Sequence, residues 1–154
     1  RNNDGSDSPK IWNDLMTNNT VQTNPFGLAV ELTNISQTTT NVLVDPTNMI
    51  LNGSQGAVSK LIFHNGATIK LTPTANPTAK GLIWQTGVAK TSNTKVMCAS
   101  STFFNGRVVL LTDSSPADDG TGNPSDTLYF GWTDAAGNHT RLHLNASYWL
   151  AKLQ

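Results

Sequence analysis

Turn-forming residues interrupt this sequence about every 8–12 residues, a spacing typical of β-sandwiches and barrels. The runs between the turns are rich in Val, Thr and aromatic residues, which favour strands. In the last run, apolar residues alternate with polar ones and predict a long final strand: Leu142, Leu144, Ala146, Tyr148 and Leu150. The sequence therefore predicts an all-β fold, an antiparallel β-sandwich or barrel of jelly-roll type with about 8–10 short strands.

Two Asn-Gly pairs predict β-hairpins, because both central residues of a type I′ turn need positive φ. One is Asn65-Gly66, within AVSKLIFHNGATIKLTP, and the other is Asn105-Gly106, within KVMCASSTFFNGRVVLLTDS. Further strands are expected in PFGLAVELTNIS, NVLVDP and KGLIWQTGVAK.

One segment, SPKIWNDLMTN, has the features of a helix. Ser8 is placed to cap the first turn, Pro9 suits the first helical position, and apolar residues follow at a spacing of four. We therefore expect at most one short helix, near the N-terminus. The first ten residues, RNNDGSDSPK, are polar and contain Gly and Pro, which predicts a flexible arm or hinge over 1–10. A single β domain is expected over 11–154.

The charges are few and balanced, with ten basic and ten acidic residues among 154. A nucleic-acid-binding surface needs excess positive charge to displace the counterions of the phosphates, so no nucleic-acid partner is expected. No apolar run approaches the roughly 18 residues of a membrane helix, so no membrane insertion is expected. A neutral surface gives little electrostatic protection against association. The balance therefore favours self-association, as a dimer or trimer.

The stretch at 113–126, in which four aspartates stand among Ser, Gly, Pro and Asn, is the candidate for a metal site. The four carboxylates are Asp113, Asp118, Asp119 and Asp126. Calcium takes six to eight oxygen ligands on flexible backbone, so these side chains would suit a calcium ion. The EF-hand spacing is absent, and a plain solvated loop or a catalytic carboxylate pair are the alternatives. Calcium is the only cofactor that the sequence suggests.

The histidines and the single cysteine give no catalytic motif. His139 and His143 are four residues apart, and on the predicted final strand they would lie roughly 13 Å apart, too far for one metal ion. No nucleotide-binding fingerprint and no G-x-S-x-G motif occurs, so no enzyme is expected. A Ser-His-Asp triad remains an alternative, because geometry rather than spacing defines it. Cys98 lies in an apolar run and is predicted to be buried.

Tryptophan is the candidate for ligand contact, because its ring both stacks on sugars and anchors protein interfaces. On the predicted final strand, Trp149 would face outward on the same side as Arg141. Trp132 is expected at a rim or in the core. Trp149, Trp132 and Arg141 are therefore the predicted ligand or interface residues.

The neutral chain, rich in Thr, Asn and Ser, resembles the projecting (protruding) domain of a small non-enveloped RNA-virus capsid protein, of nodavirus or tombusvirus type. In this comparison RNNDGSDSPK corresponds to the hinge after the shell domain, and YFGWTDAAGNHTRLHLNASYWLAKLQ to a closing strand pair. The resemblance implies a location on the virion surface, association into dimers or trimers, and attachment to a host receptor. It also implies that an acidic loop binds calcium, as in some such domains.

The sequence as a whole predicts a non-enzymatic, surface-exposed binding and assembly domain, a viral capsid projection for subunit association and host-receptor attachment. One alternative is a lectin-type β-sandwich that binds a glycan with the help of calcium. A second alternative is a secreted hydrolase on a β fold. Either alternative would be secreted or extracellular rather than on a virion.

Overall fold

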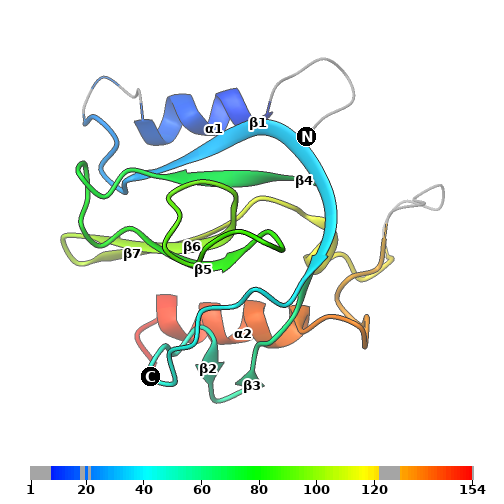
Figure 1. Ribbon diagram of the computed structural model, residues 1–154. Coiled ribbons are helices and arrows are strands. Elements are labelled where there is room, and N and C mark those ends of the chain that lie inside the picture. The colour runs from blue at the N-terminus through cyan, green and yellow to red at the C-terminus, as the bar shows by residue number, and fades with distance from the viewer. Residues whose placement is uncertain (1–7, 18–19, 21, 122–128, 154) are drawn as a thin grey trace.

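The computed structural model describes residues 8–17, 20, 22–121 and 129–153 (Figure 1). In this part the fold is mostly β, with antiparallel sheets and two short helices. The helices are α1 (Ser8–Thr17) and α2 (His139–Leu150), with a 3₁₀ turn η1 at Ser115–Ala117. The strands are β1 (Leu28–Thr39), β2 (Asn52–Gly53), β3 (Gly56–Ala57), β4 (Leu61–Leu71), β5 (Lys80–Trp84), β6 (Val96–Phe103) and β7 (Gly106–Leu111).

The main sheet has five strands in the order β1-β4-β6-β5, with β7 also paired to β6. β2 and β3 form a separate two-stranded ribbon. The segment after β1 forms an antiparallel bridge to β5 at Val42 and Ile83. Figure 1 shows α1 along β1 on one side of the sheet, and α2 with the β2–β3 ribbon on the other side.

Apolar side chains cover both faces of the main sheet. On one face, Leu142 and Ala146 of α2 pack into a buried cluster with Phe63, Ile83 and Met97. A second cluster is formed by strand and turn residues: Leu28, Ile69, Leu71, Trp84, Val96 and Ala99, with Phe26, Ala79 and Val88 against them. A third, smaller cluster places Met16 of α1 against Val30 and Ala67. The sheet is therefore enclosed from two sides, which accounts for the continuously buried run of Val96–Ser101 in β6.

The predicted final strand is wrong, because residues 139–150 form α2. The buried residues His139, Leu142, Asn145 and Ala146 recur at intervals of three and one, which places them on a single face of a helix. The same segment contains no Val or Ile, the residues that favour strands most. The helical spacing is therefore a stronger signal here than the alternation of leucines. The expectation of at most one helix is also wrong, because α2 is a second helix.

The two Asn-Gly pairs behave differently. β6 and β7 do form a hairpin, but its two loop residues are Phe104 and Asn105, because Gly106 pairs with Phe103. Asn65-Gly66 is not a turn, since β4 runs through it from Leu61 to Leu71. The ladder with β1 shifts register at this point, and Asn65 has a φ of 62°. The pair therefore marks a β-bulge, the other common use of positive φ in a strand.

The predicted N-terminal helix is confirmed by α1. Its first residues, 8–10, belong to the predicted arm, and the rest of that arm lies outside the described residues. Asn13 fixes the helix to the sheet, because its Oδ1 accepts a hydrogen bond from the Val30 N–H at 2.6 Å and its Nδ2 donates to the Val30 carbonyl at 2.8 Å. α1 therefore has a defined position on β1.

Candidate functional site

A small polar pocket of about 210 Å³ lies between strands β5 and β6, the loop at 45–52 and helix α2. This volume corresponds to about seven water molecules at about 30 Å³ each. Six of the lining residues are polar and two are apolar: Asn48, Thr78, Lys80, Ser100, Ser101 and Thr102, with Ile50 and Trp149. The pocket thus brings Trp149, one of the predicted ligand residues, beside a group of hydroxyls.

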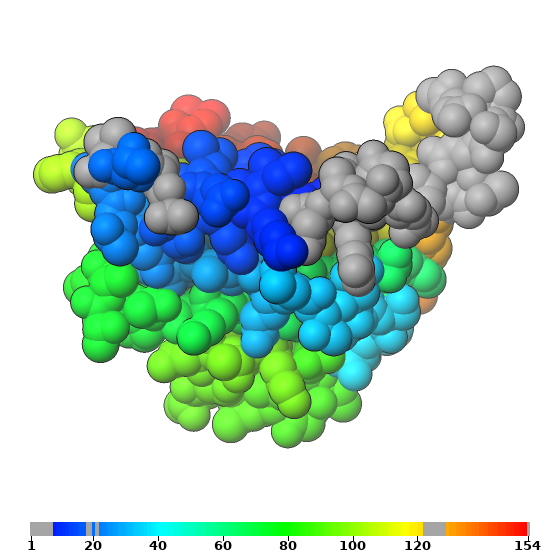
Figure 2. Space-filling model, turned by 90° about the horizontal axis from the view of Figure 1, so that it is seen from above, coloured from blue at the N-terminus to red at the C-terminus, as the bar shows by residue number. Residues whose placement is uncertain are grey.

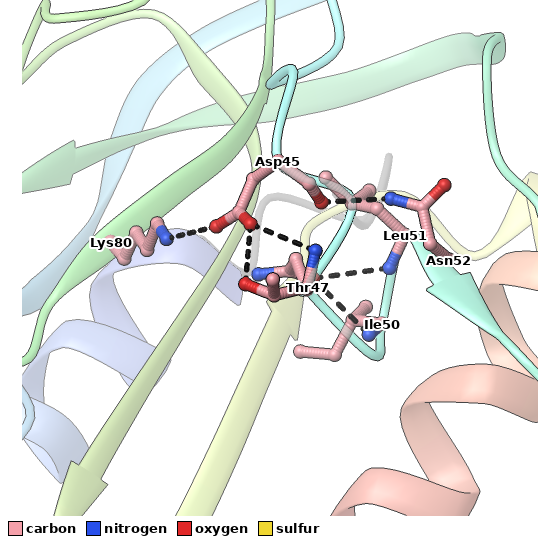
Figure 3. A network of polar contacts seen from close by, with 7 residues as sticks. Asp45, Thr47, Ile50, Leu51, Asn52 and Lys80 are labelled. Atoms are coloured by element: carbon pink, nitrogen blue, oxygen red, sulfur yellow. Dashed lines mark hydrogen bonds and ion pairs between the residues drawn. The ribbon is translucent and has the colours of Figure 1, made fainter.

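The loop that forms one wall of the pocket is held by its own side chains (Figure 3). One Asp45 oxygen accepts hydrogen bonds from the backbone N–H and the hydroxyl of Thr47, at 3.0 and 2.7 Å. Asn48 Oδ1 accepts the backbone N–H groups of Ile50 and Leu51 in the same way, each at 3.1 Å. Such side-chain turns fix a loop without secondary structure. The wall is therefore shaped before any ligand arrives.

Lys80 and Asp45 form an ion pair at the edge of this pocket, with Nζ 2.9 Å from Oδ2. The hydrogen bond from the Thr47 hydroxyl is the largest cause that lowers the pKa of Asp45, to about 2, and the bond from Lys80 follows. The carboxylate therefore stays ionised at all but strongly acidic pH. The negative charge of Asp45 offsets the positive charge of Lys80, so this pair adds no net charge to the pocket.

The Trp149 indole is held in place by Arg107 of β7. The Arg107 guanidinium carbon lies 4.9 Å from the centroid of the Trp149 ring, a cation–π distance. Arg107 Nη1 also donates a hydrogen bond to the Trp149 carbonyl. Trp149 is half-buried against the core, not outward-facing as the predicted strand required. Its position on α2 nevertheless places it among the residues that line the pocket.

Trp132 and Arg141 line a different, more open depression of about 610 Å³, at the start of α2. The Trp132 ring centroid lies 5.9 Å from that of His143. Arg141 is exposed and donates a long hydrogen bond, 3.3 Å, to the Ala57 carbonyl. The structure therefore brings these two predicted residues together and separates them from the pocket that Trp149 lines.

The aspartates of the predicted calcium loop stabilise turns. Asp113 accepts hydrogen bonds from the backbone N–H groups of His64 and Ser115, at 2.6 and 2.9 Å. Asp118 accepts from the Gly120 N–H, and Asp119 from the N–H and hydroxyl of Thr121. The Thr121 hydroxyl is the main cause that lowers the pKa of Asp119.

A calcium site at this loop stays a prediction. Among the described residues, no three His, Cys, Asp or Glu side chains lie close enough to hold a metal ion. Asp126 lies outside the described residues. The turn bonds explain why Asp, Gly and Ser recur here, because short polar side chains bind their own backbone two residues on.

His139 is buried, and both of its ring nitrogens have backbone partners. Nε2 lies 3.1 Å from the Ile62 N–H, from which it accepts, so the proton sits on Nδ1 and is donated to the Gly131 carbonyl at 2.7 Å. This arrangement needs the neutral ring. Burial is the main cause that lowers the pKa of His139.

The remaining histidines bond or stack within the described part of the chain. His143 shares a helix face with His139, contrary to the strand separation expected from the sequence, but its Nδ1 bonds to the His139 carbonyl. The His64 ring stacks on Tyr129 with centroids 3.9 Å apart. In the described part of the chain, no histidine nitrogen has a serine hydroxyl or a carboxylate as its hydrogen-bond partner.

An exposed apolar surface on α1 was not recognised from the sequence. Ile11, Trp12 and Leu15 are 61%, 54% and 60% exposed, whereas Pro9 and Met16 of the same helix are buried. Figure 2 shows α1, in blue, on the outside of the molecule. Part of the signal was present, because at 3.6 residues per turn Ile11 lies about 140–160° around the helix from Met16 and Pro9.

No protein-family model, curated protein or solved structure matches this chain. Neither helix in the described part has the length and apolar content needed to cross a bilayer.

Proposed function

We propose that the protein is a non-enzymatic binding and assembly domain that associates with a second copy of itself through α1. The observation that carries this proposal is the exposure of Ile11, Trp12 and Leu15 on one face of the helix. Together these side chains expose on the order of 400 Å² of apolar surface, within the range of the largest patches on monomers, which are often functional. This face is the α1 surface.

The size of the α1 surface suits a second copy held weakly. A stable interface takes roughly 800 Å² from each partner, so the α1 surface supplies about half of that. Burying it in both copies would remove about 800 Å² in total, the size of a weak and transient contact, so the dimer would be readily reversible. Formal neutrality of the chain favours the same outcome, because copies without net charge do not repel.

A capsid projection on the virion surface is the setting that we propose for this association, with host-receptor attachment as its second role. The antiparallel β architecture and the low, balanced charge support that proposal. We propose further that the main sheet is a barrel rather than a sandwich. Backbone bonds from Leu43 N–H to the Leu82 carbonyl and from Trp84 N–H to the Asn41 carbonyl, at 2.8 and 3.0 Å, support closure.

Sedimentation across a wide concentration range tests the α1 surface. The informative variant is Ile11→Gln/Trp12→Gln, because Gln is a good helix former and keeps α1 intact. Val44→Gln is the matched control, since Val44 is 84% exposed and lies after β1. We expect wild type and the control to dimerise with rising concentration, and the double variant to stay monomeric. A wild-type monomer throughout, or a double variant that dimerises equally well, would refute the proposal.

A further inference from the structure

Two hydroxyls of β6 line the pocket beside Trp149 and have no hydrogen-bond partner among the described residues. Ser100 is only 7% exposed, and its Oγ makes no hydrogen bond to any described residue. Thr102, two residues further along β6, also has a free hydroxyl in the described part of the chain, and it lies on the same strand face. Neither oxygen is among the fully buried polar atoms of the described residues, so both hydroxyls are open to the pocket and free to hydrogen-bond to an occupant.

The charge of the pocket distinguishes between classes of ligand. Lys80 would attract an anion, but the Asp45 carboxylate lies 2.9 Å from its Nζ and stays ionised. An anionic ligand would have to compete with this carboxylate, whereas an uncharged one would not. The pocket therefore favours a neutral ligand.

The remaining wall gives the ligand its shape. Ile50 and Trp149 are the two apolar lining residues, and Arg107 holds the indole from β7. A volume of about 210 Å³ is below the roughly 300 Å³ of the smallest drug-sized sites. A single ring of this size, with hydroxyls at its rim and C–H groups on its face, could hydrogen-bond to the polar lining residues and pack against Ile50 and Trp149.

We propose that this pocket binds one uncharged sugar residue. The Ser100 and Thr102 hydroxyls bond to its hydroxyl groups, and the indole of Trp149 packs against its C–H groups. This role goes beyond association through the α1 surface and does not depend on it. Because the loop at 45–52 is already held by its turns (Figure 3), little ordering is needed on binding.

NMR titration with glucose, galactose and N-acetylglucosamine tests this site, with glucuronate as the charged counterpart of glucose. We expect the indole N–H signal of Trp149 to shift with a neutral sugar while that of Trp12 on α1 stays unchanged. Glucuronate should bind more weakly than glucose, because the Asp45 carboxylate repels it.

Two substitutions test whether the sugar binds in this pocket. Ser100→Ala and Thr102→Val each remove one hydroxyl with little change in shape, and each should weaken the neutral sugar about 3- to 10-fold, the effect of one hydrogen bond. Ser54→Ala is the control, an exposed serine in the turn between β2 and β3. Absence of neutral-sugar binding, unchanged affinity in both variants, or tighter binding of glucuronate would overturn the inference. The two variants are independent, so failure of one to fold leaves the other as the test.

Discussion

Asn145 is a polar residue of α2 that contacts the β2–β3 ribbon. It is fully buried. Its Oδ1 accepts a hydrogen bond from the Gln55 N–H and its Nδ2 donates to the Gly56 carbonyl, both at 3.0 Å. These two bonds join α2 to the turn between β2 and β3. Asn145→Ala removes both bonds and leaves their backbone partners without a replacement.

The loss of stability in Asn145→Ala can be estimated from those two hydrogen bonds. Each hydrogen bond contributes about 1 kcal/mol, and a backbone group left unsatisfied adds about 1–3 kcal/mol when water cannot reach it. Gln55 is exposed and Gly56 half-buried, so water partly compensates both groups. We therefore expect a loss of about 2–3 kcal/mol. For a chain of this size, that loss lowers the melting temperature by about 5–10 °C.

Thermal melting followed by circular dichroism measures this loss. Ser147→Ala is the control, because Ser147 is exposed two residues further along α2 and its hydroxyl bonds only to the His143 carbonyl. It should change stability by less than about 0.5 kcal/mol. If Asn145→Ala melted within about 2 °C of wild type, the docking of α2 on the β2–β3 turn would be refuted.

The isosteric change Asn145→Asp gives a second, pH-dependent readout of the same contacts. The carboxylate still accepts from Gln55 but has no proton for the Gly56 carbonyl, and its burial raises its pKa. Stability is then lost as the pH rises above the usual aspartate pKa near 4, and recovers as the protonated carboxyl donates to Gly56 in acid. A variant equally destabilised at pH 3 and pH 7 would contradict this reading.

Three further changes have defined outcomes. Because burial lowers the pKa of His139 below its usual value of 6.5, the unfolded chain takes up a proton first and stability should fall as the pH drops below about 6.5; a His139→Gln variant should lose this slope in urea titrations. Burial raises the pKa of the Cys98 thiol to about 12, so a thiol reagent should label it only after denaturation, and rapid labelling of the native protein would place the thiol at the surface. Gly66→Ala should lower stability by about 1–3 kcal/mol in urea titrations, because a Cβ there would lie 2.6 Å from that of Asp113; a wild-type midpoint would show that the bulge can relax.

The strands were predictable where local pattern and burial agree. The segments containing β1, β5, β6 and β7 were identified because apolar runs and turn residues alternate there. The burial of Cys98 followed from its apolar neighbours and is confirmed. Asn65-Gly66 was misread because positive φ serves a bulge as well as a turn, and only the pairing with β1 distinguishes them.

α2 and the pocket could not be derived from local pattern alone. Leu142, Leu144 and Leu150 satisfy a period of two, and only burial shows that Leu142, Asn145 and Ala146 face the core. Trp149 was singled out because it is an aromatic residue among polar ones, yet its neighbours in the pocket come from 48–50, 78–80 and 100–102. No spacing along the chain encodes that proximity, because it depends on how the loop, the strands and α2 meet.

The amide of Asn13 occupies both hydrogen-bonding groups of Val30 on β1, a strand at the end of the sheet order. At that residue it takes the place that a neighbouring strand would otherwise fill. Another chain therefore finds no unpaired donor or acceptor at Val30 with which to extend the sheet. Pairing with such unpaired edge groups is how strands from different molecules aggregate. Edge-to-edge polymerisation of copies of this protein is thus blocked at this position.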